Sequence, residues 1–262
     1  MAIYRPIAFV MASTNHGTMI VNRHDYKPVE GGAVGVGHQL LSFSSFDQNE
    51  VDTVLQLLNS RRQHFGDGVM AIDCGANIGV HTIEWARFMH GWGEVLAFEA
   101  QERIYYALAG NISINNCFNA RAFWAAVGHQ NGSIQVPKPD YLIPASYGSL
   151  ELIPSEHNEF IGQNIDYQHN TMPTQMIAID DLGMRRLDFI KIDVEGMELA
   201  VLSGAKRSIA EHKPMMLIEK IKTNEQELSA FLTSLAYTVF PFGNNVIAVH
   251  KTDPGLPLIR LG

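Results

Sequence analysis

Five short apolar runs, separated by helix-like segments, set the pattern of this chain. The runs have the length of strands buried on both faces of a sheet, and they cover residues 69–72, 94–98, 122–126, 189–192 and 215–218. Helical segments of ten or so residues are expected at 80–89, 103–114 and 225–235. Strands that alternate with helices of this length form βαβ units. We therefore predict an α/β fold with a mostly parallel sheet and helices on both of its faces.

The two ends of the chain differ from this alternation. Short β-like pieces fill residues 1–46, and the main pattern begins with a helix expected over 48–62. The last segments predict an antiparallel hairpin with strands at 237–240 and 246–249. We therefore expect an N-terminal β-rich extension, followed over 47–262 by a domain whose sheet ends in an antiparallel pair.

The middle of the chain interrupts the alternation. The pair Asn131–Gly132 is a type I′ turn signal and predicts a hairpin that joins Val127 to Val136. Residues 137–172 then show no regular pattern. A loop of this length inside a compact domain usually has a function, so we interpret it as a substrate-side insertion.

Composition and charge narrow the class of protein. The formal net charge is −8, which disfavours nucleic acid as a partner, because gripping phosphates requires clustered Lys and Arg. No apolar stretch approaches the ~20 residues that cross a bilayer, so no membrane span is expected. The two cysteines, Cys74 and Cys117, cannot build a disulfide framework, and the reducing cytoplasm is the expected location.

A glycine-rich turn, DCGANIG over 73–79, follows the first parallel strand and precedes a helix. The carboxyl ends of strands in α/β sheets bind nucleotide-like ligands. Counted from Gly75, a dinucleotide fingerprint needs glycine at the third and sixth positions, so that the backbone can approach a pyrophosphate. Asn77 and Val80 occupy these positions. A nicotinamide-dependent oxidoreductase is therefore disfavoured and remains as an alternative.

The spacing acid-x-Gly-x-x-x-Gly instead suits S-adenosylmethionine, which carries no phosphate. Gly75 and Gly79 would let the backbone approach the amino-acid tail of this ligand, and Asp73 would attract its ammonium group. Glu99 ends the next strand and would accept hydrogen bonds from two ribose hydroxyls. The backbone at Ala126 is a candidate contact for the adenine.

A second group of ionisable side chains is expected beside this site. Lys191 lies in a predicted strand, Asp193 and Glu195 follow its carboxyl end, and Glu219 ends the next strand. A lysine in a central strand requires a partner. We interpret Glu195 or Asp193 as the acceptor of a substrate proton, Lys191 as the group that orders the cluster or tunes its pKa, and Glu219 as a residue that positions the substrate.

Several alternatives for these residues stay open. Glu195 would otherwise stabilise the dipole of a helix that starts near Gly196, and Lys191 would be only a structural ion-pair partner. The carboxylates would also suit a divalent cation, although our leading interpretation includes no metal. His81, at a helix start, either faces the ligands or packs inside the domain.

Three segments resemble the FkbM family of S-adenosylmethionine-dependent methyltransferases: DCGANIGVHT at 73–82, LDFIKIDVEGMELAVLSGA at 187–205 and PMMLIE at 214–219. The resemblance covers about residues 47–250. It implies a class I methyltransferase fold with a Rossmann-like sheet, S-adenosyl-L-methionine as cofactor and S-adenosyl-L-homocysteine as product. The residues expected to contact the cofactor are Asp73, Gly75, Ala76, Asn77, Gly79, His81, Thr82, Glu99, Ala126 and Asp193.

The resemblance implies methyl transfer without choosing the acceptor, because members look like O-methyltransferases of sugars and polyketides or N-methyltransferases of peptide side-chain amides. We expect transfer to a hydroxyl of a saccharide or natural product by in-line displacement, with the peptide amide as the alternative. A protein that binds the cofactor without catalysis is disfavoured, because Lys191, Asp193 and Glu195 are all present.

Overall fold

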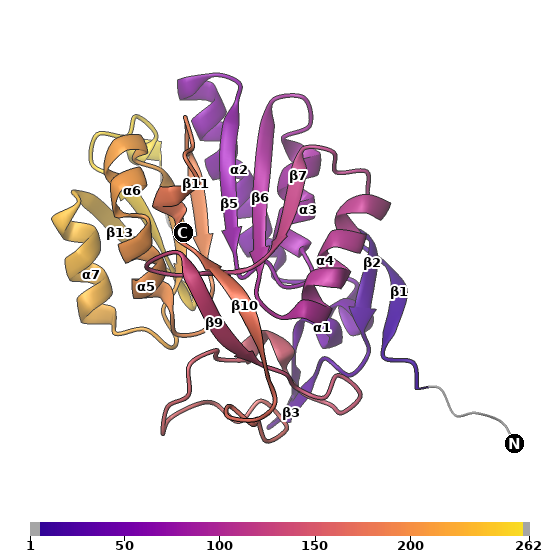
Figure 1. Ribbon diagram of the computed structural model, residues 1–262. Coiled ribbons are helices and arrows are strands. Elements are labelled where there is room, and N and C mark those ends of the chain that lie inside the picture. The colour runs from indigo at the N-terminus through magenta and orange to yellow at the C-terminus, as the bar shows by residue number, and fades with distance from the viewer. Residues whose placement is uncertain (1–5, 259–262) are drawn as a thin grey trace, which may run out of the picture.

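The central sheet has seven strands, of which five run parallel. The computed structural model describes residues 6–258, and its strands follow the order β13-β14-β12-β11-β5-β6-β7 (Figure 1). The last two strands form the antiparallel pair expected at the end of the chain. The predicted α/β class is thus confirmed. The strands are β5 (Val69–Cys74), β6 (Gly93–Glu99), β7 (Ala120–Trp124), β11 (Phe189–Ile192), β12 (Met215–Glu219), β13 (Tyr237–Phe242) and β14 (Asn245–His250).

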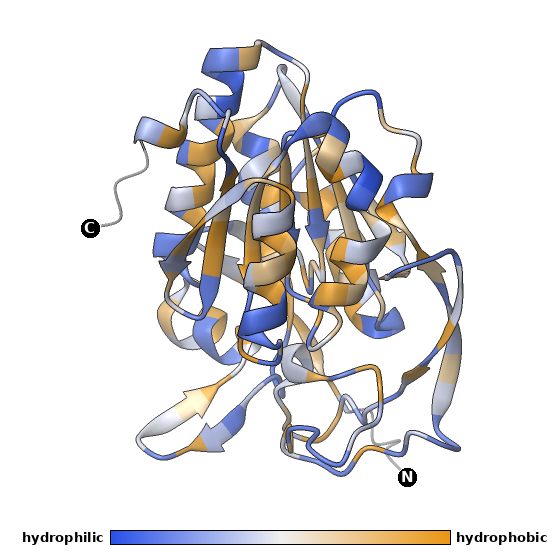
Figure 2. Cartoon of the chain, turned by 90° about the vertical axis from the view of Figure 1, so that its left-hand side faces the viewer, coloured by the Kyte–Doolittle hydropathy of each residue, from blue (hydrophilic) through white to orange (hydrophobic). Residues whose placement is uncertain are grey.

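Side chains of this sheet alternate between two cores, one on each face. In β11, Phe189 belongs to one core, whereas Ile190 and Ile192 belong to the other, as the two-residue period of a strand requires. Figure 2 shows hydrophobic residues gathered along the strands and on the helix sides that face them. The first core includes residues of α2 (Gln48–Phe65), α3 (Val80–Phe88) and α4 (Glu102–Ile114), and the second those of α5 (Glu198–Gly204), α6 (Lys206–His212) and α7 (Glu225–Ser234).

The strand predicted over 122–126 is in fact two shorter pieces. β7 ends at Trp124, and β8 (Ala126–Val127) belongs to a separate three-stranded sheet. The chain turns between them at Ala125, whose N–H donates to the carbonyl oxygen of Glu99 (3.1 Å). The apolar run is continuous in sequence, so the pattern of residues does not reveal this break.

The hairpin predicted at Asn131–Gly132 is wrong. β8 and β9 (Gly132–Pro137) are not neighbours, because β10 (Thr171–Ile177) lies between them. Neither Asn131 nor Gly132 has the positive φ of a type I′ turn. Asn131 Oδ1 instead accepts a hydrogen bond from the N–H of Ala178 (2.9 Å), so this side chain holds the loop to the residue that directly follows β10, much later in the chain.

The N-terminal residues form two small hairpins and a helix, and the second strand of the first hairpin packs against α4. Asn111 of α4 donates through Nδ2 to the carbonyl oxygens of Ile20 (3.2 Å) and Ile78 (2.8 Å), and so ties β2 to the loop before α3. Residues 1–5 of the expected extension lie outside the described residues. The elements are β1 (Phe9–Thr14), β2 (Gly17–Asn22), β3 (Lys27–Val29), β4 (Gly32–Val34) and α1 (Val36–Phe43).

The insertion at 138–170 connects β9 to β10 at the lower side of Figure 1, below the ends of the parallel strands. Asp25 ties it to the N-terminal part, because its carboxylate accepts hydrogen bonds from the N–H groups of Gly37 (2.9 Å) and Tyr147 (3.1 Å). Burial raises the pKa of Asp25 to about 6, against the effect of these two bonds. Short 3₁₀ helices complete the fold: η1 (Tyr147–Ser149), η2 (Ile179–Asp181) and η3 (Leu256–Leu258).

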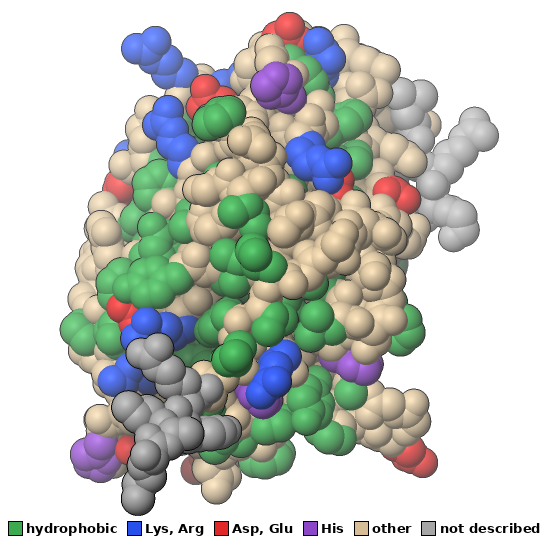
Figure 3. Space-filling model, turned by 90° about the vertical axis from the view of Figure 1, so that its right-hand side faces the viewer, with side chains coloured by type: hydrophobic (Ala, Val, Ile, Leu, Met, Phe, Trp, Pro, Cys, Tyr) green, Lys and Arg blue, Asp and Glu red, His purple; other side chains and the backbone are tan. Residues whose placement is uncertain are grey.

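The face that carries β1 and β2 exposes hydrophobic side chains among few charged groups (Figure 3). Met11 of β1 is 74% exposed, and Phe118, after α4, is 87% exposed. No helix within the described part of the chain is long and apolar enough to cross a bilayer.

Candidate active site

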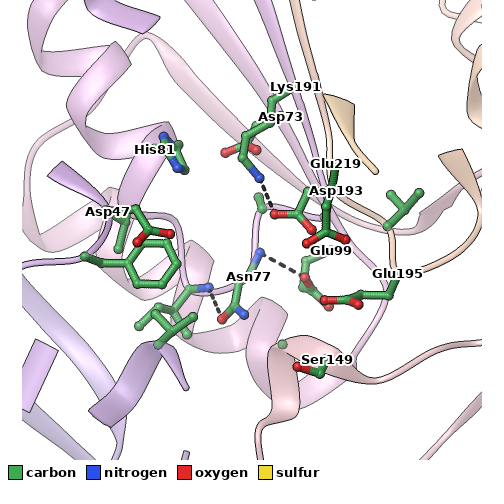
Figure 4. Close-up of a pocket in the computed structure, with 18 of the residues that line it drawn as sticks. Asp47, Asp73, Asn77, His81, Glu99, Ser149, Lys191, Asp193, Glu195 and Glu219 are labelled. Carbon is green, nitrogen blue, oxygen red and sulfur yellow. Dashed lines mark hydrogen bonds and ion pairs between the residues drawn. The ribbon is translucent and has the colours of Figure 1, made fainter. Parts of the chain in front are cut away.

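A large cavity opens where β5, β6, β11 and β12 end. Its volume is about 560 Å³, within the range of roughly 300–1,000 Å³ that is usual for small-molecule sites. Parts of the N-terminal region, the insertion and the β13–β14 turn complete its walls. Figure 4 shows the expected carboxylates and Lys191 around it. All of the site residues expected from the sequence line this cavity except Thr82.

Gly75 and Gly79 line the cavity, and their backbone conformation favours glycine at both positions, with close packing as a second reason at Gly75. Both have positive φ angles, of 77° and 92°. A Cβ atom on Gly75 would lie 1.8 Å from the carbonyl oxygen of Asp193, and one on Gly79 would lie 2.6 Å from Leu108 Cδ1. The glycines therefore let the loop cross close to β11 and α4, in addition to any ligand that the loop contacts.

Asp73 offers the cavity a carboxylate oxygen that has no partner. Its side chain is fully buried at the end of β5, and Oδ2 accepts a hydrogen bond from Thr82 Oγ1 (2.6 Å). Oδ1 is buried without a hydrogen-bond partner. Thr82 thus lies behind the cavity and orients Asp73, rather than forming part of the wall. Such an oxygen is costly unless a ligand pairs with it.

Glu99 is held in place by backbone groups. Its two oxygens accept hydrogen bonds from the N–H groups of Asn77 (3.0 Å) and Gln101 (2.8 Å). Burial raises the pKa of Glu99 to about 7, although these two bonds lower it. Each oxygen keeps a further lone pair, so this carboxylate can accept hydrogen bonds from a diol in a fixed orientation.

Lys191 and Asp193 form the ion pair expected at the end of β11. Lys191 Nζ lies 2.6 Å from Asp193 Oδ2, and Lys191 is 4% exposed. Burial lowers the pKa of Lys191, but the charges of Asp193, Asp73 and Glu50 outweigh this effect and raise it well above its usual value. Lys191 therefore stays charged, paired with Asp193 and influenced by the nearby charge of Asp73.

Asp193, Glu195 and Glu219 converge, each with a carboxylate oxygen within 4.8 Å of the others. Burial and the charge of Asp193 raise the pKa of Glu195 to about 7, although Lys222 lowers it. Burial and the charges of Asp193 and Glu195 raise the pKa of Glu219 to about 9. At neutral pH, Glu219 is therefore protonated while Glu195 is close to its titration midpoint.

The helix expected near Gly196 starts two residues later, at Glu198. Glu195 precedes its first turn and has a left-handed φ of 55°, so it is not a helix-end charge of the kind considered above. Glu198 Oε1 accepts hydrogen bonds from the N–H groups of Val194 (3.2 Å) and Gly196 (3.1 Å). These bonds hold the tight loop that directs Glu195 into the cavity.

Two ammonium groups lie against this cluster of carboxylates. Lys191 pairs with Asp193, whereas Lys222 pairs with Glu195 and also with Glu159 of the insertion. Glu219 carries a proton up to a pH of about 9. The three carboxylates also lie close enough together to hold a metal ion.

Two polar residues that the sequence patterns missed, Glu50 and Asn245, join the predicted His81 opposite the carboxylates. His81 Nε2 lies 3.0 Å from Glu50 Oε1, and Asn245 Nδ2 donates to Glu50 Oε2 (2.6 Å). Burial opposes ionisation of Glu50, but His81 and Lys191 outweigh it and lower its pKa. His81 thus faces both the cavity and Glu50. The polar run from Asp47 to Glu50, at the start of α2, was the signal that could have revealed Glu50. A turn residue such as Asn245 gave no signal.

The sheet order, the glycine loop and the cavity at the strand ends define the class I methyltransferase fold. The crystal structure of a methyltransferase FkbM from Methylobacillus flagellatus KT shares this fold, with a TM-score of 0.50 and 19% sequence identity, over 73% of this chain and 48% of that one. A family model described as the methyltransferase FkbM domain matches residues 73–239. The chain belongs to the FkbM methyltransferase family.

Two curated proteins are similar to this chain in sequence. Methyltransferase sdnD from Sordaria araneosa is 25% identical over 157 residues, which cover 51% of this chain and 59% of that protein. Methyltransferase 1 from Beauveria bassiana (strain ARSEF 2860) is 25% identical over 150 residues, which cover 53% and 59%. The chain therefore spans less than two thirds of the length of these relatives.

Proposed function

We propose that the protein is an S-adenosylmethionine-dependent methyltransferase, and the pairing of Asp73 with Glu99 around one cavity carries this proposal. Asp73 presents a buried oxygen without a partner, which fits the ammonium group of the cofactor. Glu99 presents a carboxylate fixed by two N–H groups, which fits the ribose diol. The loop between them has Asn77 and Val80 where a pyrophosphate would need glycine, and this disfavours a nicotinamide cofactor.

The remaining wall of the cavity fits the same ligand. Gly75, Ala76, Gly79 and His81 would border its amino-acid end, and the backbone at Ala126 its adenine. Asp193 would lie between the cofactor and the acceptor. The bound cofactor supplies an electrophilic methyl group, and the chain supplies binding, orientation and proton transfer.

The mechanism that we propose depends on the carboxylate cluster. In-line displacement needs the acceptor atom held about 3–3.5 Å from the methyl carbon. Glu195 is the proposed acceptor of the substrate proton, because its pKa of about 7 suits a general base. Asp193, already paired with Lys191, is the second candidate. Glu219, protonated below a pH of about 9, would donate a hydrogen bond that positions the acceptor, and Lys191 would keep Asp193 ionised and oriented.

As acceptor we propose a hydroxyl group of a saccharide or natural product. Residues 146–152 of the insertion and the turn at 242–245 contribute to the cavity, as does Phe46 beside Asp47. Carboxylates outnumber cationic groups in its wall, and this composition favours hydroxyl donors over phosphorylated acceptors. The alternative acceptor is a peptide side-chain amide. We further propose a cytoplasmic location, which the two free, buried cysteines support.

Two measurements test this function. Calorimetric titrations with S-adenosylmethionine, S-adenosylhomocysteine and NAD are expected to show binding of the first two alone, and binding of NAD in their place would overturn the proposal. A mass-spectrometric screen of neutral glycosides, polyketides and Asn- or Gln-containing peptides should then find an acceptor that gains one methyl group only when the cofactor is present. Methylation confined to peptides would replace the hydroxyl acceptor by the amide.

A further inference from the structure

Lys222 connects the candidate base to the insertion. It lies in the turn between β12 and α7, with a side chain that is 13% exposed. Its Nζ is 2.6 Å from Glu195 Oε2 and 3.2 Å from Glu159 Oε2. The same ammonium group donates a hydrogen bond of 2.9 Å to the carbonyl oxygen of Ser149, a residue that lines the cavity.

We propose that Lys222 is a positioning residue that keeps Glu195 ionised and fixes the insertion beside it. The proposal rests on the proposed function of Glu195 as the base. No sequence motif singled out Lys222, and it reaches the reacting groups only through Glu195. Its placement means that one cation bonds simultaneously to the base and to two points of the insertion.

The ion pair with Lys222 opposes the negative charges that surround Glu195. The negative charges of Asp193 and Glu198 raise the pKa of Glu195. The charge of Glu195 in turn raises the pKa of Glu219. Lys191 forms its ion pair with Asp193, whereas Lys222 forms one with Glu195 itself. Glu219 has an Oε2 atom without a partner. Burial and the charges of Asp193 and Glu195 raise the pKa of Glu219 to about 9, so Glu219 holds a proton more readily than Glu195, whose pKa is about 7.

The same contact orders the wall of the cavity. Glu159 pairs with Lys222 and also with Lys27 of β3, so the insertion is held between the N-terminal part and the loop after β12. Glu151 Oε1 lies a further 3.8 Å from Lys222 Nζ. Protonation of Glu195 would remove the strongest partner of Lys222 and loosen this link. The ionisation of the base and the placement of the insertion are thus coupled.

A titration that needs no acceptor tests the electrostatic part. Carbon-13 NMR of the carboxyl groups in glutamate-labelled protein reports the pKa of Glu195, whose signal is the one missing from Glu195→Gln. Lys222→Met, or Lys222→Gln if the first variant does not fold, is expected to raise this pKa by ~1–3 units, the usual effect of losing an adjacent opposite charge. Lys222→Arg should restore most of the shift.

A matched control is Lys220→Met, because Lys220 belongs to the same turn but pairs with Glu225 at the surface (3.2 Å). This control should leave the pKa of Glu195 unchanged. Limited proteolysis within residues 150–160 should be faster in Lys222→Met than in wild type or Lys220→Met. An unchanged pKa of Glu195 in Lys222→Met would overturn the electrostatic part, and an unchanged cleavage rate would overturn the link to the insertion.

The outcome separates this inference from the proposed function. If Glu195→Gln retains full turnover while Lys222→Met shifts the pKa, the assignment of the base is wrong and the link between Lys222 and Glu195 stands. If Glu195→Gln is inactive and Lys222→Met leaves the pKa of Glu195 as in wild type, the base stands and the inference about Lys222 is wrong.

Discussion

Thr82 Oγ1 donates a hydrogen bond of 2.6 Å to one oxygen of Asp73, and the other oxygen of Asp73 is buried without a partner. Thr82 thereby fixes the carboxylate so that its free oxygen belongs to the cavity. A hydrogen bond to a charged group stabilises by ~1.5–3 kcal/mol, and here one such interaction is left for a ligand. Asp73 and Thr82 should therefore affect the binding of cofactor to different extents.

Asp73→Ala is expected to weaken binding of S-adenosylmethionine by up to ~150-fold, because the variant lacks the acceptor for the ammonium group. Thr82→Val keeps that acceptor but loses its orientation, and should weaken binding by ~10-fold. Isothermal titration calorimetry measures both dissociation constants, with circular dichroism to show that the variants fold. An affinity within threefold of wild type for Asp73→Ala would contradict the placement of the cofactor.

Glu99 should make the ligand-free protein less stable as the pH rises. Its pKa is raised from 4.5 to about 7 in the folded state, so the folded state binds the proton more tightly than the unfolded state does. The free energy of unfolding should then fall between pH 4.5 and 7, by up to about 3 kcal/mol from this group.

The variant Glu99→Gln provides the comparison, because it removes the titration and nearly keeps the shape. Urea unfolding at several pH values should show a flatter dependence for Glu99→Gln than for wild type over this window. Parallel curves would mean that Glu99 titrates normally. Glu99→Gln should also bind S-adenosylmethionine more weakly, because an amide presents only one acceptor oxygen to the ribose diol.

Glu195→Gln should retain the affinity for the cofactor but lose turnover by roughly 10²–10⁴-fold, the usual contribution of a positioned base. In wild type, kcat should fall below a pH of about 7 as Glu195 takes up a proton. Once an acceptor is found, single-turnover measurements across pH check both expectations. Turnover equal to that of wild type would show that Glu195 does not accept the proton.

Gly75→Ala should destabilise the fold even without ligand. A Cβ atom there would lie 1.8 Å from a backbone oxygen of Asp193, at a φ of 77° that side chains rarely adopt. We expect a loss of at least ~3 kcal/mol, seen as a lower midpoint of thermal unfolding. Gly132→Ala is the control, because a Cβ at Gly132 meets no atom within 4 Å, and its midpoint should stay close to that of wild type.

The sequence predicts the central sheet and most of the site for the same physical reason. Parallel strands are continuous apolar runs, and the carboxyl ends of neighbouring strands meet at one edge. Asp73, Glu99 and Glu219, each at the end of such a run, could therefore be placed together in advance. Their common position follows from local pattern alone.

The features that the sequence did not predict depend on contacts between segments far apart in the chain. Asn131 bonds to Ala178 rather than closing a hairpin, and that partner directly follows a strand across the whole insertion. Glu50 and Lys222 reach the site from separate elements through long side chains, and no periodic pattern encodes such contacts. Gly75 was expected to let a ligand approach the backbone. Its close packing against Asp193 also requires glycine, and the sequence does not show this packing because it arises only when β5 and β11 lie side by side.

The pairing of β9 with β10 has a consequence for how recognition can change. These strands pair residue by residue from Gly132 with Met176 to Pro137 with Thr171, so residues 138–170 leave and rejoin the body of the protein at one fixed stem. The entropy of closing such a segment grows only slowly with its length. Segments of the insertion that make none of the contacts with Asp25 and Lys222 can therefore change in length at a small cost in entropy, and such changes would alter the wall of the cavity while the strand ends stay as they are.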